Sequence, residues 1–256
     1  MKTLAATFVA IPIVLYVVAC ALLYLGQRDM MYFPTPIVAR ALAEELRLEA
    51  NGESLKIWHR PRPTPKALLY FGGNAEDVAR SIATLRTALP DHSLYLTNYR
   101  GYGGSSGEPS EEALYADAVA LYDHARQTHA SVSVVGRSLG SAVAAELAAV
   151  RPVERLVLVT PFDSIENVVK DRFGLLPVSL LLKDKYELIG RVPQITAPVL
   201  IVLAANDVVV PRARSLALIQ AFEGRDFEAV VLRGTGHNTI DGSADYLGIL
   251  RDFFAG

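Results

Sequence analysis

The sequence predicts an α/β fold, in which a mostly parallel central sheet is covered by helices on both faces and preceded by an apolar N-terminal helix. Runs rich in valine and leucine, typical of strands buried on both faces, alternate with segments whose apolar residues have helical spacing. An Asn51-Gly52 pair between two strand-like runs predicts an antiparallel hairpin at one edge. The length of 256 residues and the 51% hydrophobic content fit one large domain with a well-buried core.

The first element, residues 1–30, is expected to be a membrane anchor with a transmembrane helix over about 3–26. No charged side chain lies between Lys2 and Arg28, and a helix of this length spans roughly 36 Å, enough to cross a hydrocarbon core of about 30 Å. A cleaved signal peptide and a lipoprotein modified at Cys20 are the alternatives. The apolar core of a signal peptide is usually shorter, about 7–15 residues, which argues against a cleaved signal. Apolar residues also follow Cys20, whereas the residues after the modified cysteine of a lipoprotein are usually polar. We therefore expect a single-pass membrane protein whose globular domain lies on a side of the membrane that the flanking charges do not indicate.

Residues 31–256 are expected to form the globular domain, whose elements follow from short apolar runs between turns and from helical periodicity. The hairpin covers 46–60. The later strands are predicted at 67–71, 93–98, 131–135, 155–160, 198–204 and 227–232. The helices are predicted at 76–89, 111–129, 139–150, 215–222 and 244–254.

Residues 164–195 break this alternation, because they are too long for a plain crossover. Their apolar part, FGLLPVSLLL, lies between charged flanks. We interpret the segment as a short cap over the site or as a surface that dips toward lipid. A helix packed on the core is the simpler alternative.

Composition narrows the functional classes. The net charge is −2 and no basic run is interleaved with aromatic residues, so no nucleic-acid partner is expected. The single cysteine excludes an intramolecular disulfide. His124 and His129 are five apart on one predicted helix and do not share a face, so no metal site is expected. No cofactor is indicated.

The motif Gly-Arg-Ser-Leu-Gly joins a predicted strand to a predicted helix and makes Ser138 the candidate nucleophile. A sharp turn there forces the serine into unfavourable dihedral angles and requires small neighbours, which Gly136 and Gly140 provide. The backbone N–H of Leu139 then points toward a developing oxyanion at the helix N-terminus.

A second oxyanion donor is expected in the loop FGGNAED after the strand at 67–71. Two glycines allow the backbone to approach a substrate closely. We assign the backbone N–H of Asn74 as the donor, with Gly73 or Ala75 as alternatives. An ordinary glycine turn, in which Asn74 or Glu76 caps the next helix, is compatible with the same residues.

The candidate base and acid follow the last two strands. His237 lies in GTGHNT, between the last strand and the last helix, whereas the other four histidines, at 59, 92, 124 and 129, lie in or beside predicted elements. Asp207 ends LIVLAAND at the tip of the preceding strand. The competing acid is Asp163, one strand earlier, whose simpler role is to cap a helix. The order serine, aspartate, histidine is the one expected for α/β-hydrolases.

The motifs GRSLGS, NYRGYGGSSGEPS, LAANDVVVP and GHNT together resemble the membrane-anchored branch of the α/β-hydrolase superfamily, which includes abhydrolase-domain depalmitoylases and lysophospholipid lipases. The resemblance runs from about residue 31 to the C-terminus and implies the α/β-hydrolase fold. It implies the same roles for Ser138, Asp207 and His237, and a loop at 98–109 that shapes the site without doing chemistry. Three departures are Gly72 in place of histidine, Asn98 in place of aspartate, and Ala204-Ala205 in place of a His-Gly-like pair.

These residues predict a serine hydrolase that cleaves carboxylic esters or thioesters through an acyl-enzyme. The anchor and the apolar insert favour lipid-like or acylated substrates. A serine peptidase or amidase on the same fold, and a non-catalytic membrane-anchored scaffold, are the alternatives. A dehalogenase is disfavoured, because it would carry aspartate in place of Ser138.

Overall fold

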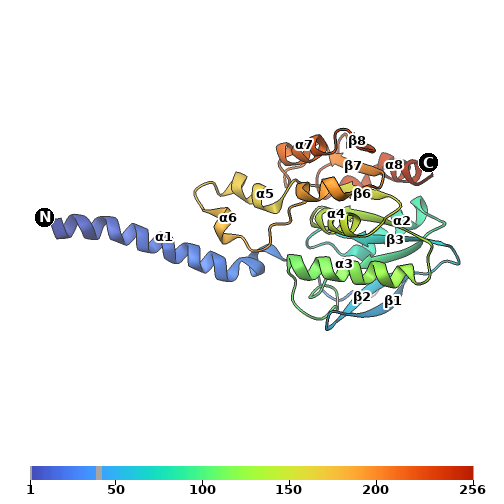
Figure 1. The fold of residues 1–256 in the computed structure, drawn as a ribbon, viewed down its shortest axis with the longest axis horizontal. Coiled ribbons are helices and arrows are strands. Elements are labelled where there is room, and N and C mark those ends of the chain that lie inside the picture. The colour runs from blue at the N-terminus through green and yellow to red at the C-terminus, as the bar shows by residue number, and fades with distance from the viewer. Residues whose placement is uncertain (1, 39–41, 256) are drawn as a thin grey trace.

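The structure is a computed structural model that describes residues 2–38 and 42–255. A long helix, α1 (Lys2–Met31), projects from a globular body that contains the sheet (Figure 1). The stretch Ile11–Met31 of this helix is long and apolar enough to cross a membrane. The predicted α/β class, with an apolar helix before the sheet, is confirmed.

The sheet has eight strands in the order β1-β2-β4-β3-β5-β6-β7-β8. Strand β2 is antiparallel to both of its neighbours, and the other pairs are parallel. The strands are β1 (Glu44–Ala50), β2 (Glu53–Arg60), β3 (Lys66–Phe71), β4 (Ser93–Thr97), β5 (Ser131–Arg137), β6 (Leu156–Val159), β7 (Val199–Ala204) and β8 (Phe227–Leu232). The parallel strands β3 to β8 therefore direct the loops that follow them toward one edge of the sheet, where ligands bind in such folds.

The predicted hairpin is confirmed and forms the β1 side of the sheet. Ala50 pairs with Glu53 across the turn. Asn51 and Gly52 have φ values of 52° and 83°, the left-handed pair that a two-residue hairpin turn requires and that an Asn-Gly sequence favours.

Helices cover both faces of the sheet. They are α2 (Ile82–Ala88), α3 (Glu111–Arg126), α4 (Leu139–Val150), α5 (Ile165–Arg172), α6 (Val178–Leu181), α7 (Arg212–Ala221) and α8 (Ala244–Ala255), with short 3-10 turns η1 (Val78–Ser81), η2 (Ile189–Gln194) and η3 (Ile240–Gly242). Buried residues of α3, α4 and α7 form one apolar core with the sheet, and those of η1, α2 and α8 form the other. This is the two-faced packing that continuous apolar strands predict.

Several boundaries differ from the sequence prediction. The helix expected from Glu76 begins as η1 at Val78, because Asp77 accepts a hydrogen bond from the N–H of Ala79 and caps it. The helix expected to reach His129 ends at Arg126. The helix expected at 215–222 begins at Arg212, directly after Pro211, whose fixed φ suits a helix start.

The segment 164–195 lies between β6 and β7 and contains α5, α6 and η2. Figure 1 shows α5 and α6 on the side of the body from which α1 projects, and α1 contacts α6. Helix α5 contains no fully buried residue, although its Ile165 and Val168 pack against the core. The interpretation of this segment as a cap stays a prediction, as does the alternative of a helix packed on the core.

Candidate active site

Ser138 lies at the turn between β5 and α4, with φ 51° and ψ −118°. These dihedral angles are unfavourable for a residue with a side chain. A hydrogen bond of 2.8 Å from Ser138 N–H to the carbonyl of Val159 fixes the turn to β6. A Cβ at Gly136 would overlap the carbonyl of Gly140, and a Cβ at Gly140 would overlap the carbonyl of Phe71. The two glycines are therefore required by the close approach of α4 to β3 and β5.

His237 contacts both the candidate nucleophile and the candidate acid. Its Nε2 lies 2.9 Å from Ser138 Oγ, and its Nδ1 lies 2.8 Å from Asp207 Oδ2. The imidazole is buried, with 6% of its surface exposed, whereas Ser138 and Asp207 are half-buried. The structure thus brings together three side chains from three separate loops in the arrangement that activates a serine hydroxyl.

The loop after β7 holds Asp207 in its ionised form. Its Oδ1 accepts hydrogen bonds from the N–H groups of Val209 and Val210, at 2.9 and 2.8 Å. Burial opposes the charge, but the hydrogen bonds from His237 and from these two N–H groups outweigh it, so the pKa of Asp207 is lowered. The Oδ2 atom of Asp207 faces Nδ1 of His237, and Nε2 of the same ring faces Ser138 Oγ.

Asp163, the alternative acid, does not contact His237. Its Oδ2 accepts hydrogen bonds from Asn167 Nδ2 and Arg214 Nη1, at 2.8 and 3.2 Å. The N-cap of α5 is Ser164, whose Oγ accepts from Asn167 N–H, so the capping role expected for Asp163 belongs to its neighbour. Asp163 instead ties α5 to α7.

The loop after β3 lies beside Ser138. A Cβ at Gly73 would lie 3.5 Å from Ser138 Cβ. The Gly73 N–H already donates to Glu76 Oε2 at 2.7 Å, which removes this alternative donor. Among the residues that the structure describes, the N–H groups of Asn74, Ala75 and Leu139 have no hydrogen-bond acceptor. Asn74 and Leu139 are the amides that the sequence nominates as oxyanion donors, and Ala75 is the alternative that this criterion leaves open.

Sequence reasoning missed a buried ion pair that braces this loop. Glu76 Oε2 lies 2.9 Å from Arg137 Nη1, and Glu76 Oε1 accepts from the hydroxyls of Tyr70 and Ser81, at 2.6 and 3.0 Å. Arg137 Nη2 donates to the carbonyl of His237 at 3.0 Å. The pair therefore connects the loop after β3 with the loop that delivers the candidate base.

Burial opposes the charge on Arg137, but Glu76 outweighs it and raises the pKa of Arg137. A signal for this pair is present in the sequence, since Arg137 is the last residue of the buried strand β5. A charged residue at such a position requires a partner.

A second missed feature is the clamp around the Asn74 side chain. Its Oδ1 accepts from the Tyr102 hydroxyl at 2.7 Å and from Phe33 N–H at 3.1 Å. Its Nδ2 donates to the carbonyl of Met31. Tyr99 adds a hydrogen bond of 2.7 Å to the carbonyl of Gly72. The glycine-rich loop and the end of α1 therefore hold the candidate oxyanion loop together, in place of a histidine at position 72.

The remaining histidines lie away from this site. His59 stacks on Tyr95, and burial lowers the pKa of His59 to about 4. His129 contacts the Tyr95 hydroxyl and the carbonyl of Thr64. Within the described ranges, no group of three or more His, Cys, Asp or Glu side chains could hold a metal ion.

Comparison with solved structures defines the class of fold. An esterase of Pyrococcus furiosus, Pf2001, matches with a TM-score of 0.69 at 16% identity, over 88% of this chain and 97% of that one. The esterase Est1E of Butyrivibrio proteoclasticus, with ferulic acid bound, matches with a TM-score of 0.68 at 18% identity, over 82% of this chain and 98% of that one. These likenesses show that the fold is that of the α/β hydrolases.

Sequence relatives identify the family. No family model matches the chain. An uncharacterized protein of Mycobacterium tuberculosis strain H37Rv is 37% identical over 229 residues, covering 83% of this chain and 80% of that protein. Alpha/beta hydrolase domain-containing protein 17B of Xenopus laevis is 30% identical over 195 residues, covering 73% of this chain and 66% of that protein. The chain belongs to the α/β-hydrolase superfamily.

Proposed function

We propose that this chain is a serine hydrolase of carboxylic esters or thioesters that works through an acyl-enzyme. The observation that carries the proposal is the continuous hydrogen-bonded path from Ser138 Oγ through His237 to Asp207. The fold of known esterases and the relatives named as α/β hydrolases support hydrolysis as the reaction class.

In the proposed mechanism, Ser138 Oγ attacks the acyl carbonyl while His237 Nε2 takes the hydroxyl proton. Asp207 orients the imidazole and stabilises the imidazolium. The N–H groups of Asn74 and Leu139 donate to the tetrahedral oxyanion. The carbon–oxygen or carbon–sulfur bond then breaks, and the leaving group takes the proton from His237. Water, deprotonated by the same imidazole, releases the acid and restores the serine.

We also propose that residues 1–30 anchor the protein in a membrane and that 31–256 form the hydrolase domain, with 164–195 as its cap. Retention of the N-terminal helix is supported by its contacts with the cap. Gln27 Nε2 donates to the carbonyl of Leu181 at 2.9 Å, and Arg28 pairs with Asp184 at 2.9 Å. A cleaved signal peptide would not need side chains matched to the mature domain.

The test is hydrolysis of p-nitrophenyl butyrate, a butyryl thioester and a butyryl anilide by the full-length protein, together with labelling by a fluorophosphonate. Wild type is expected to hydrolyse the ester or the thioester faster than the anilide and to be labelled. Ser138→Ala is expected to lose both activities. Preference for the anilide would support the amidase alternative. Activity and labelling that persist in Ser138→Ala would refute the assignment, and a folded wild type with neither would support the scaffold alternative.

A further inference from the structure

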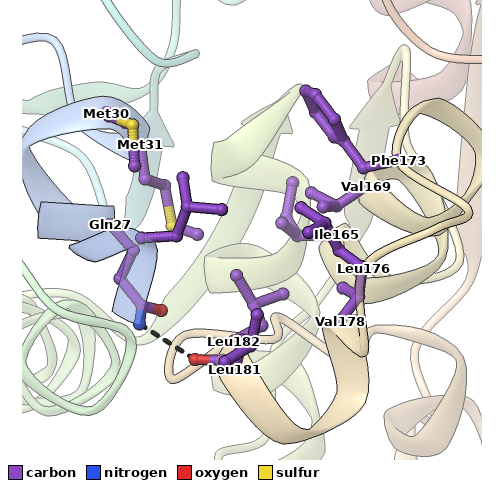
Figure 2. Close-up of a pocket in the computed structure, with 11 residues that line it drawn as sticks. Gln27, Met30, Met31, Ile165, Val169, Phe173, Leu176, Val178, Leu181 and Leu182 are labelled. Carbon is purple, nitrogen blue, oxygen red and sulfur yellow. Dashed lines mark hydrogen bonds between the residues drawn. The ribbon is translucent and has the colours of Figure 1, made fainter. Parts of the chain in front are cut away.

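An apolar groove of about 310 Å³ lies between the end of α1 and the cap. Figure 2 shows Met30 and Met31 of α1 on one side, Ile165, Val169 and Phe173 of the cap on the other, and Leu181 and Leu182 below them. The volume is at the lower end of the roughly 300–1,000 Å³ range of small-molecule sites.

Among the described residues that line the groove, Gln27 has the only polar side chain, and its polar atoms are all hydrogen-bonded. Its Nε2 donates to the carbonyls of Tyr24 and Leu181, and its Oε1 accepts from Lys183 N–H at 2.7 Å. Figure 2 shows the bond to Leu181 directed away from the centre of the groove. With no polar group left to pair, the groove suits an unbranched hydrocarbon better than a polar ligand.

The groove is joined to the candidate active site through Met31 and Asn74. The carbonyl of Met31, whose side chain lines the groove, accepts from Asn74 Nδ2. Asn74 follows Gly73, which lies against Ser138. The wall supplied by α1 is therefore joined by one hydrogen bond to the loop proposed to bind the oxyanion.

The other side of the groove lies where the bilayer is expected. Helix α1 has 30 residues and a length of about 45 Å, so about 10 residues extend beyond a hydrocarbon core of roughly 30 Å. The groove uses the last nine residues of α1, from Leu23 to Met31. At the cap tip, Leu175 is 93% exposed, and its carbonyl accepts from the Tyr16 hydroxyl, which lies further along α1 toward its N-terminus. Such a leucine fits a lipid environment.

We propose that this groove binds the acyl chain of the substrate, which enters from the bilayer between α1 and the cap. The proposal rests on the proposed acyl hydrolase function and adds a substrate class, acyl chains of medium length or longer. In this arrangement α1 is a wall of the binding site as well as an anchor. The chain lies along α1 while the ester carbonyl reaches Ser138 beside the Asn74 loop.

The first test compares kcat/KM for p-nitrophenyl decanoate and butyrate, using the full-length protein in detergent micelles. The groove variants are Val169→Trp and Leu176→Trp, in which an indole occupies the space. The matched controls are Val150→Trp on α4 and Leu216→Trp on α7, which lie outside the groove and are 45% and 46% exposed in wild type. Each methylene buried in the groove contributes up to about fourfold in kcat/KM.

Wild type is expected to prefer the decanoate. Both groove variants are expected to lower the decanoate-to-butyrate ratio by at least about tenfold, the equivalent of two excluded methylenes. The controls are expected to keep the wild-type ratio. An unchanged ratio in a groove variant that a short-chain fluorophosphonate still labels would overturn the proposal.

A second measurement does not depend on how the variants fold. The full-length Ser138→Ala protein is irradiated with a decanoyl ester that carries a diazirine at its terminal carbon, and the crosslinked peptides are mapped by mass spectrometry. Crosslinks in 23–31 and 165–182 are expected, and crosslinks only elsewhere would overturn the groove assignment. If wild type hydrolyses neither ester and is not labelled, the proposed function fails, while the crosslinks still report whether the groove holds a chain.

Discussion

The buried Glu76–Arg137 pair gives the sharpest prediction, because it connects the loop after β3 with the loop that carries His237. The side chains of Glu76 and Arg137 are only 8% and 12% exposed. Replacing Glu76 with glutamine keeps the shape but removes the charge. The amide oxygen can still accept from Gly73 N–H, and the amide nitrogen can donate to the hydroxyls of Tyr70 and Ser81, which are able to accept.

The expected loss of unfolding free energy depends on which buried groups each variant leaves unpaired. Breaking a buried ion pair by removing one partner costs about 3–5 kcal/mol. For Glu76→Gln we expect the lower end, about 3 kcal/mol, because the hydrogen bonds are retained and only the charge opposite Arg137 is lost. For Glu76→Ala we expect about 5 kcal/mol, because four hydrogen bonds to the carboxylate are lost and the Arg137 charge has no partner.

Activity is expected to decrease as the loop after β3 loses its restraints. Loss of one oxyanion donor costs about 2.7–4 kcal/mol, or roughly 10²–10³ in kcat. Glu76→Ala, which releases Gly73 N–H, is expected to approach this range, and Glu76→Gln is expected to fall well short of it. Both kcat and kcat/KM should decrease together, because the oxyanion forms in the transition state and is absent from the bound substrate.

The assay combines urea unfolding with ester hydrolysis by the detergent-solubilised full chain. The control is Asp123→Asn, which breaks the exposed pair with Arg151 and is expected to cost at most about 1 kcal/mol. Equal losses of unfolding free energy in Glu76→Gln and Asp123→Asn would refute the argument that burial makes the Glu76–Arg137 pair more stabilising than the exposed pair.

Three further predictions concern the acid, the pH dependence and the turn at the nucleophile. Asp207→Asn is expected to lower kcat by about 10⁴, whereas Asp163→Asn, which does not contact His237, should lower it less than about tenfold; similar losses in steady-state assays would contradict the assignment of Asp207. Because the native pKa of Asp207 is lowered, its ionisation adds stability above the unfolded value of about 3.9, and this contribution is lost as pH falls through the native pKa. The difference in unfolding free energy between wild type and Asp207→Asn should therefore shrink below about pH 4, and a difference independent of pH would oppose this view. Gly140→Ala should cost at least about 1–3 kcal/mol by overpacking against the carbonyls of Phe71 and Gly72, while Gly248→Ala in α8, with open space around it, should be neutral or stabilising in the same urea titration.

Local sequence patterns were enough to predict most of the fold. The Asn51-Gly52 turn, the helix at 139–150 and the strand at 227–232 are found at the predicted positions, because each depends on turn chemistry or periodicity within a few residues. The predicted start of the helix after β3, at Glu76, is wrong, because the element begins at Val78. Glutamate suits a first helical turn, and no local pattern shows that Glu76 is instead held by Arg137, which is distant in sequence.

The same limit applies to the site. The candidate triad could be predicted because its members lie directly after the parallel strands β5, β7 and β8 of one sheet, in the order expected for this fold. The groove and the Asn74 clamp could not, because they depend on where α1 and the cap come to lie, and nothing in the periodicity of either segment specifies that contact. The apolar residues of the insert 164–195 indicated only that part of its surface contacts another apolar surface.

Asn74 explains why the departure at Gly72 is compatible with an ordered oxyanion loop. A glycine removes the side chain that would brace this turn, yet the three contacts of the Asn74 side chain and the Tyr99 hydroxyl supply the restraint from outside the loop. Two of those contacts come from Met31 and Phe33, where α1 joins the domain. The position of the proposed anchor and the geometry of the proposed oxyanion site are therefore linked through the side chain of Asn74.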